Sequence, residues 1–299
     1  MPSIQPIANA APSRVQHFFT LAFLSLIWGT SFILIKKSVG IYPPEQVGLM
    51  RLGLSGLAFL PFLVFQWKKI DWKRLHFFLL VGLCGSGIPA FLFSFAQKHI
   101  SSSVAGILNS LTPLFTLLLG IFVFRATLIW AKVIGVLIGL VGATLLILFS
   151  NGGNLQAEAG YSLLIVLAAV CYATNSNIVG NIFRDLNSLL ISSVSFALVG
   201  IPAFLILVFR TDFLQILIHN PRGLEGLGYV SILALVGTVL STIIFFRLIQ
   251  QTSPVFASTV AYVMPIVALM WGLLDGETVG IYHLLGMALI LSGVYLSRK

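Results

Sequence analysis

The sequence predicts an all-α membrane protein with ten transmembrane helices arranged as two inverted five-helix repeats. Its 299 residues are 58% hydrophobic and only 8% charged, whereas soluble domains carry about a quarter charged residues. Ten apolar stretches are long enough to cross a bilayer, at roughly 20 residues per crossing. The two halves of the chain also share residues at a near-constant offset.

The ten stretches are continuously apolar rather than alternating with a period of two, which indicates helices. A spanning segment must pair its backbone groups internally, and a helix does so within itself. The connections are short, so we expect no attached soluble domain. In the first half the predicted spans are residues 18–35, 47–65, 77–96, 104–124 and 128–149. In the second half they are residues 161–183, 189–209, 227–249, 255–274 and 282–296.

A shift of 152 residues aligns parts of the two halves. The shared order of the matches favours duplication, with two domains at residues 14–150 and 158–299. Because five spans is an odd number, the halves insert in opposite orientations, a recurring plan of secondary transporters that allows alternating access. The matched pairs are Gly85 with Gly237, Ser101 with Ser253, Ala105 with Ala257, Pro113 with Pro265 and Gly120 with Gly272.

The net charge of +9 does not indicate a nucleic-acid partner, because of where the basic residues fall. With the N-terminus inside and ten spans, 11 lysines and arginines lie in inner segments or in the adjoining span ends, and 5 lie in outer segments. With Arg51, which lies within a span, these account for all 17. This is the positive-inside bias that sets membrane topology. We therefore expect both termini in the cytoplasm.

Several short motifs resemble those of a known family. Residues 26–32 (LIWGTSF), closing with Lys36, look like the first-span signature of the drug/metabolite transporter superfamily. Residues 101–105 and 111–115 resemble the junction of the third and fourth spans in its EamA-domain members. Residues 263–266 resemble the same stretch in the second repeat, and 276–278 the usual Gly-Glu loop. The resemblance covers essentially the whole chain, as two tandem EamA units.

The resemblance implies a ten-helix exporter or facilitator of small metabolites, with amino acids as a frequent substrate class. It implies a bacterial-type inner membrane as the location, with the lipid bilayer and a small-molecule substrate as partners. The oligomeric state stays open between monomer and homodimer. One departure is visible, because Phe124-Arg125-Ala126 stands where the first repeat would normally carry Gly-Glu.

Polar side chains deep in the spans mark a candidate substrate cavity, since they are costly in hydrocarbon and usually face a cavity or another helix. For a single serine or threonine we favour helix–helix hydrogen bonding. A buried asparagine needs several partners, so cavity lining is weighed evenly with packing. Pro113 and Pro265 remove backbone donors and are the candidate kink or hinge positions. The candidate substrate-binding residues are Trp28, Thr30, Asn109, Thr112, Tyr172, Asn175, Ser241, Ser258 and Tyr262.

Two large side chains each have two interpretations. Trp28, near the centre of the first span, is either a cavity wall for an aromatic or cationic substrate or a packed core aromatic. Arg51 lies about four residues inside the second span, roughly 6 Å deep. It pairs with a substrate carboxylate or, as we favour, snorkels to the headgroups or bonds to carbonyls.

The main alternative function is a lipid or lipid-linked-sugar flippase of the same architecture, which a lateral opening and a basic headgroup pocket would favour. A scaffold leaves the buried amides and mid-span prolines unexplained. An intramembrane enzyme is disfavoured, because all eight acids and all five histidines lie near span boundaries or in loops. We expect no catalytic residue, metal or cofactor. With no acid near a span centre, we expect facilitated diffusion or exchange.

Overall fold

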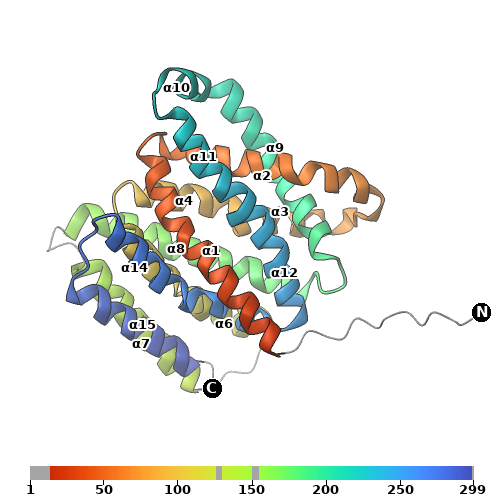
Figure 1. The fold of residues 1–299 in the computed structure, drawn as a ribbon. Coiled ribbons are helices and arrows are strands. Elements are labelled where there is room, and N and C mark those ends of the chain that lie inside the picture. Colours follow the sequence, from red (N-terminus) through yellow and green to blue (C-terminus); the bar gives the residue numbers. More distant parts are fainter. Residues whose placement is uncertain (1–13, 126–129, 150–154, 298–299) are drawn as a thin grey trace, which may run out of the picture.

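The computed structural model describes residues 14–125, 130–149 and 155–297, and these residues form helices and their connections, with no strand among them (Figure 1). Eight helical segments within the described residues are long and apolar enough to cross a membrane. The all-helical prediction is thereby confirmed, and the chain is a multi-pass membrane protein.

The first half begins with two long helices, and its next two apolar segments are each interrupted. Its last helix, α7, lies where the fifth span is predicted. The elements are α1 (Arg14–Val39), α2 (Pro44–Gln66), η1 (Trp67–Lys69), η2 (Trp72–Arg74), α3 (Leu75–Gly82), η3 (Leu83–Gly87), α4 (Ile88–Gln97), α5 (Ser102–Asn109), α6 (Thr112–Phe122) and α7 (Trp130–Phe149).

The second half has the same order of long and interrupted segments, with one addition. The short helix α10 lies in the longer connection that follows α9. The elements are α8 (Leu155–Asn181), α9 (Ser188–Arg210), α10 (Phe213–His219), α11 (Gly223–Ala234), η4 (Leu235–Leu240), α12 (Ser241–Gln251), α13 (Pro254–Ser258), η5 (Thr259–Tyr262), α14 (Met264–Leu274) and α15 (Ile281–Ser297).

The interruptions occur at equivalent places in the two halves. The π-helical segments η3 and η4 begin at Leu83 and Leu235, which the 152-residue shift superimposes. Helices α5 and α13 begin after Ser101 and Ser253, whose hydroxyls both accept a hydrogen bond of 3.1 Å from the backbone N–H three residues later. Serine stabilises a helix N-terminus in this way.

The apolar segments that contain Pro113 and Pro265 are each divided into two helices instead of forming one bent helix. Pro113 and Pro265 are the second residues of α6 and α14, where the missing N–H of proline costs little. The hydroxyl of Thr112 donates to the Asn109 carbonyl at 2.7 Å, which is the carbonyl that residue 113 would otherwise bond in a continuous helix. The prolines therefore begin new helices, and their role as hinges stays a prediction.

Equivalent helices of the two halves pack against each other. Helix α2 crosses α9 where Gly56 meets Gly200, so closely that a Cβ on Gly56 would lie 2.8 Å from the Gly200 Cα. Helices α7 and α15 lie side by side (Figure 1), and a Cβ on Gly142 would lie 2.9 Å from the Gly286 carbonyl oxygen. The two halves are thus interleaved rather than separate lobes.

Candidate functional site

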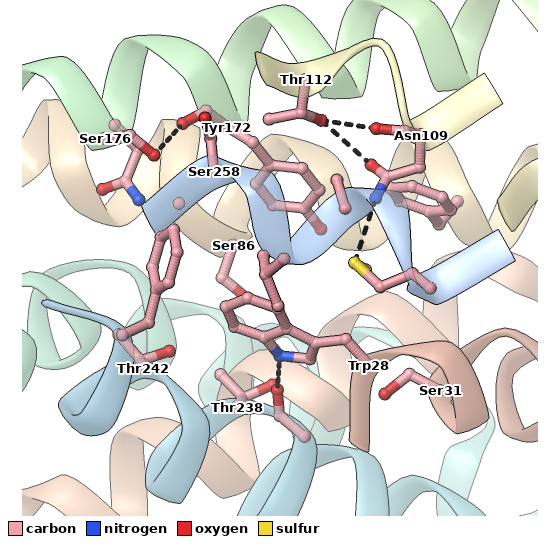
Figure 2. Close-up of a pocket in the computed structure, with 18 of the residues that line it drawn as sticks. Trp28, Ser31, Ser86, Asn109, Thr112, Tyr172, Ser176, Thr238, Thr242 and Ser258 are labelled. Carbon is pink, nitrogen blue, oxygen red and sulfur yellow. Dashed lines mark hydrogen bonds between the residues drawn. The ribbon is translucent and has the colours of Figure 1, made fainter. Parts of the chain in front are cut away.

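A cavity lies between the two halves and is lined by residues from α1, α2, α8, α9 and the four interrupted segments (Figure 2). Its wall combines aromatic rings with hydroxyl and amide groups, and Arg51 is the charged residue among its lining residues. The predicted binding residues that line this cavity are Trp28, Asn109, Thr112, Tyr172, Asn175 and Ser258.

Trp28 forms part of the cavity wall and is held in place by the π-helical segment η4. Its indole N–H donates to the Gly237 carbonyl at 2.8 Å, and its ring meets Phe245 edge-on with the centroids 5.0 Å apart. A π-helical turn shifts the backbone bonding from i−4 to i−5, and such turns are frequent at functional sites. The side chain therefore has a fixed orientation toward the cavity.

Arg51 also contacts η4, and its position differs from the snorkelling that we favour from the sequence. The side chain is buried and lines the cavity. Its Nε donates to the Thr238 hydroxyl at 3.0 Å, and the guanidinium also interacts with the Tyr172 hydroxyl. Snorkelling would leave the guanidinium exposed, so the burial of Arg51 argues against that interpretation, and the printed contacts are to hydroxyl groups.

The broken fourth segment contributes Asn109 and Thr112. The Asn109 amide donates weakly to the Met264 sulfur at 3.9 Å, which connects the break in one half to the break in the other (Figure 2). The Thr112 hydroxyl donates to the Asn109 carbonyl. Because these groups bond mainly at the two breaks, a rearrangement of either break would change the shape of the cavity.

Helix α8 presents Tyr172, Asn175 and Ser176 to the cavity. Ser176 donates back to the Tyr172 carbonyl at 2.9 Å. The Asn175 Oδ1 is buried and has no hydrogen-bond partner among the described residues, and the same is true of the Ser86 hydroxyl on η3. Buried polar atoms of this kind are normally satisfied. Both residues line the cavity, and their unsatisfied atoms make them candidates for contact with a ligand.

Three predicted residues do not line this cavity. Thr30 accepts a hydrogen bond of 3.0 Å from the indole of Trp271, which is exposed on the outside of the bundle. Ser241 is buried and donates to the Val236 carbonyl at 2.7 Å within its own interrupted segment. Tyr262 packs against the hydrophobic core. All three side chains lie in the spans but point away from the cavity, which sequence position alone does not reveal.

A second cluster of polar groups ties three elements together at one end of the bundle. Glu277, between α14 and α15, accepts hydrogen bonds from the backbone N–H and hydroxyl groups of Ser102 and Ser103, at 2.6–3.1 Å. Lys36 of α1 pairs with Glu277 and with Asp275, both at 2.8 Å. Burial acts to raise the pKa of Glu277, but the hydrogen bonds from Lys36 and the serines lower it to about 2.

Sequence reasoning missed the contribution of η3 and η4 to the cavity. Gly85 and Gly237 are aligned by the internal repeat, but nothing in the sequence indicates π-helical turns there. The position of Arg51 could have predicted a role in the site, because an ionisable residue inside a span marks a functional site by default. Its shallow sequence position concealed how far the side chain reaches.

The profile of the EamA-like transporter family matches the chain twice, at residues 18–148 and 160–298. The chain belongs to this family. It is therefore a membrane transporter of the EamA type, as the motifs of both halves predict, and its family points away from an enzyme.

Relatives of this transporter cover nearly its whole length. The "Uncharacterized inner membrane transporter YedA" of Escherichia coli K12 is 28% identical over 93% of this chain and 89% of its own. The "Probable amino-acid metabolite efflux pump" of Salmonella typhimurium is 27% identical over 95% of both chains. A solved protein crystal structure, 20% identical, matches with a TM-score of 0.66 over 95% of this chain and 96% of its own, which shows the fold.

Proposed function

We propose that this EamA-type protein is a secondary transporter that moves a small amphipathic metabolite, an amino acid or a related compound, across the inner membrane by alternating access. The observation that carries the proposal is the cavity between the two halves, where aromatic rings adjoin buried hydroxyl and amide groups. Such a wall suits a ligand with an apolar body and a few polar groups. The efflux-pump relative supports outward transport of an amino-acid metabolite.

Ten spans in two inverted domains, residues 14–150 and 158–299, are part of this proposal. Reciprocal glycine contacts support it: the Gly142 position of α7 approaches Gly286 of α15, and Gly293 of α15 approaches Gly135 of α7. The repeat superimposes Gly135 on Gly286 and Gly142 on Gly293 at a shift of 151. Each of the two contacts is therefore the equivalent of the other, as a two-fold axis between the helices requires. Helices α7 and α15 serve as the fifth and tenth spans.

Reporter fusions test the topology. Fusions after Gly153 and His219 should report the outer face, and a fusion after Lys69 the inner face, with both termini cytoplasmic. The lysine and arginine distribution is the physical basis. A cytoplasmic signal after Gly153 would contradict the inverted arrangement.

Net flow is proposed to follow the substrate's own gradient, by facilitated diffusion or exchange. No acid is among the described residues that line the cavity, and a guanidinium does not release its proton in proteins. Proteoliposomes with equal substrate on both sides and an imposed proton or sodium gradient test this step. Concentrative, ionophore-sensitive uptake of a neutral substrate would overturn it.

Counterflow in proteoliposomes tests transport itself. Vesicles preloaded with members of a metabolite panel should accumulate the matching labelled compound for at least one amphipathic metabolite. Trp28→Ala should abolish the signal per molecule of folded protein, whereas Trp271→Ala, outside the cavity, should leave it. Folded protein that moves no metabolite would overturn the proposal, and scrambling of labelled phospholipid would favour a flippase.

A further inference from the structure

Arg51 is a buried cation that faces the cavity. Arg51 is 8% exposed and lies on α2 next to the crossing with α9. Two hydroxyl groups hold the guanidinium, those of Thr238 on η4 and Tyr172 on α8. A guanidinium carries five N–H donors, so two hydroxyl partners leave donors available to the cavity.

The described part of the chain supplies no counter-charge for Arg51. None of the ion pairs among these residues includes it, and no carboxylate is among the described cavity-lining residues. An arginine keeps its charge at any physiological pH. Burial of a charge without an opposite charge is strongly unfavourable. A ligand that brings an anion into the cavity would offset this cost.

A second group of polar atoms lies about one helical turn from Tyr172. Asn175 is three residues further along α8, on the same face and roughly 5 Å along the helix axis. Its Oδ1 is a buried acceptor without a partner among the described residues, and the Ser86 hydroxyl is in the same state. An amide oxygen accepts hydrogen bonds only, so it suits an N–H or ammonium donor.

We infer that the transported substrate carries a carboxylate that binds the Arg51 guanidinium, with a hydrogen-bond donor of the same molecule directed to Asn175 and Ser86. This inference rests on the proposed function and names the substrate class of that site. A planar carboxylate matches the guanidinium in a two-bond arrangement. One guanidinium pairs with one carboxylate, whereas a phosphate dianion would bring a second negative charge for which the described lining residues hold no second cation, so a carboxylate is favoured.

Matched compounds test the inference. Purified protein is mixed with amino acids, with their amides, which lack the carboxylate, with the corresponding acids that lack the ammonium, and with phosphate monoesters. Thermal stabilisation and counterflow are measured for each. The variants are Arg51→Gln, Arg51→Lys and the control Arg210→Gln, which removes an exposed arginine at the end of α9.

Carboxylates should stabilise the protein and be transported, and their amides should bind more weakly by about 10- to 100-fold, the loss expected for one hydrogen-bonded charge pair. Arg51→Gln should remove the preference for acids over amides, Arg51→Lys should restore part of it, and Arg210→Gln should leave it unchanged. A merely structural arginine would lower stability without changing this preference.

Three results would overturn the inference: amides equal to acids, an unchanged preference in Arg51→Gln, or stabilisation by phosphate monoesters alone. Transport of neutral metabolites with no preference for acids would refute the inference and leave the proposed transport function intact. Folded protein that neither binds nor moves any compound would refute both.

Discussion

The two halves of the chain share a backbone plan and differ in their charges. A shift of 144 residues aligns α2 with α9, with Gly56 on Gly200, and places Ser195 where the first half has Arg51. Arg51 contacts Thr238 in the π-helical segment of the other half. The hydroxyls of Ser195 and of Ser86, the counterpart of Thr238, are both buried without partners among the described residues. One side of the cavity is therefore cationic and the other neutral.

The starts of α5 and α13 also differ between the halves, and the residue that would bind each start differs with them. Glu277 binds the serines at the start of α5. At the start of α13 the counterparts are Pro254, which has no N–H, and Val255, which has no hydroxyl. The counterpart of Glu277 is Arg125. The acid and the serines that bind it are thus present together at one of the two equivalent places and absent together at the other, which indicates that they function as one unit at one end of the bundle.

Among the changes that test this comparison, removal of the Glu277 carboxylate should have the largest effect on stability. The pKa of Glu277 in the folded protein is about 2, below its ordinary value of 4.5. The charged form thus stabilises the fold above pH 4.5, by about 3 kcal/mol, and this contribution is lost as the pH falls from about 4.5 toward 2. Glu277→Gln should lower the Tm at pH 7, with a smaller loss near pH 3.

Glu225 is the matched control. Its hydrogen bond from Arg222, together with one from Tyr229, also lowers its pKa to about 2, but this pair is exposed to solvent. Exposed ion pairs contribute little to stability. Glu225→Gln should leave the Tm nearly unchanged. Equal losses for the two variants would contradict a special role for the Glu277 end of the bundle.

Two tryptophans give the next comparison, between the inside and outside of the bundle. Trp28→Phe removes the hydrogen bond to Gly237 and leaves a buried carbonyl unpaired, at a cost of about 1–3 kcal/mol. We expect the counterflow rate to fall about 10-fold. Trp271→Phe removes a similar bond to Thr30 at an exposed position, and its rate should stay near the wild-type rate. The same loss in both variants, scaled to folded protein, would argue against a cavity role.

The smallest effect concerns the two π-helical glycines. A Cβ on Gly85 would lie 3.1 Å from both Cγ and Oδ1 of Asn175, whereas a Cβ on Gly237 would meet the Ser31 hydroxyl at 3.0 Å. A serine hydroxyl can rotate away, but a buried amide moves less easily. Gly85→Ala should destabilise the protein by about 1 kcal/mol, and Gly237→Ala should be near neutral. Chemical unfolding measures the free energy of unfolding of the two variants. A larger loss for Gly237→Ala than for Gly85→Ala would contradict the proposed difference between the two sides of the cavity.

Much of the fold follows from the sequence, because hydropathy reports helices directly. The repeat also aligns Ser101 with Ser253 and Pro113 with Pro265, and the structure gives each pair the same role at a helix start. The site is less predictable, since it depends on side-chain direction. Thr30 is two residues from Trp28, yet it bonds to an exposed tryptophan.

Partners far away in the sequence also determine the site. Arg51 and Thr238 are 187 residues apart, and no local pattern predicts their contact. The π-helical turns that expose the Gly237 carbonyl to Trp28 have no sequence signature either. Composition and periodicity therefore locate the polar residues within the spans, but only the packing of the two halves shows which of them meet at the cavity.

Protection of a single cysteine tests most directly whether the cavity between the halves is the substrate site. In a protein with Cys84→Ala and Cys171→Ala, Asn109→Cys places one thiol on the cavity wall, and Thr30→Cys places one outside it. Alkylation by a small thiol reagent is measured with and without a compound that the protein transports. We predict slower alkylation at position 109 and no change at position 30. Full reactivity at position 109 in the presence of saturating transported compound would contradict the account.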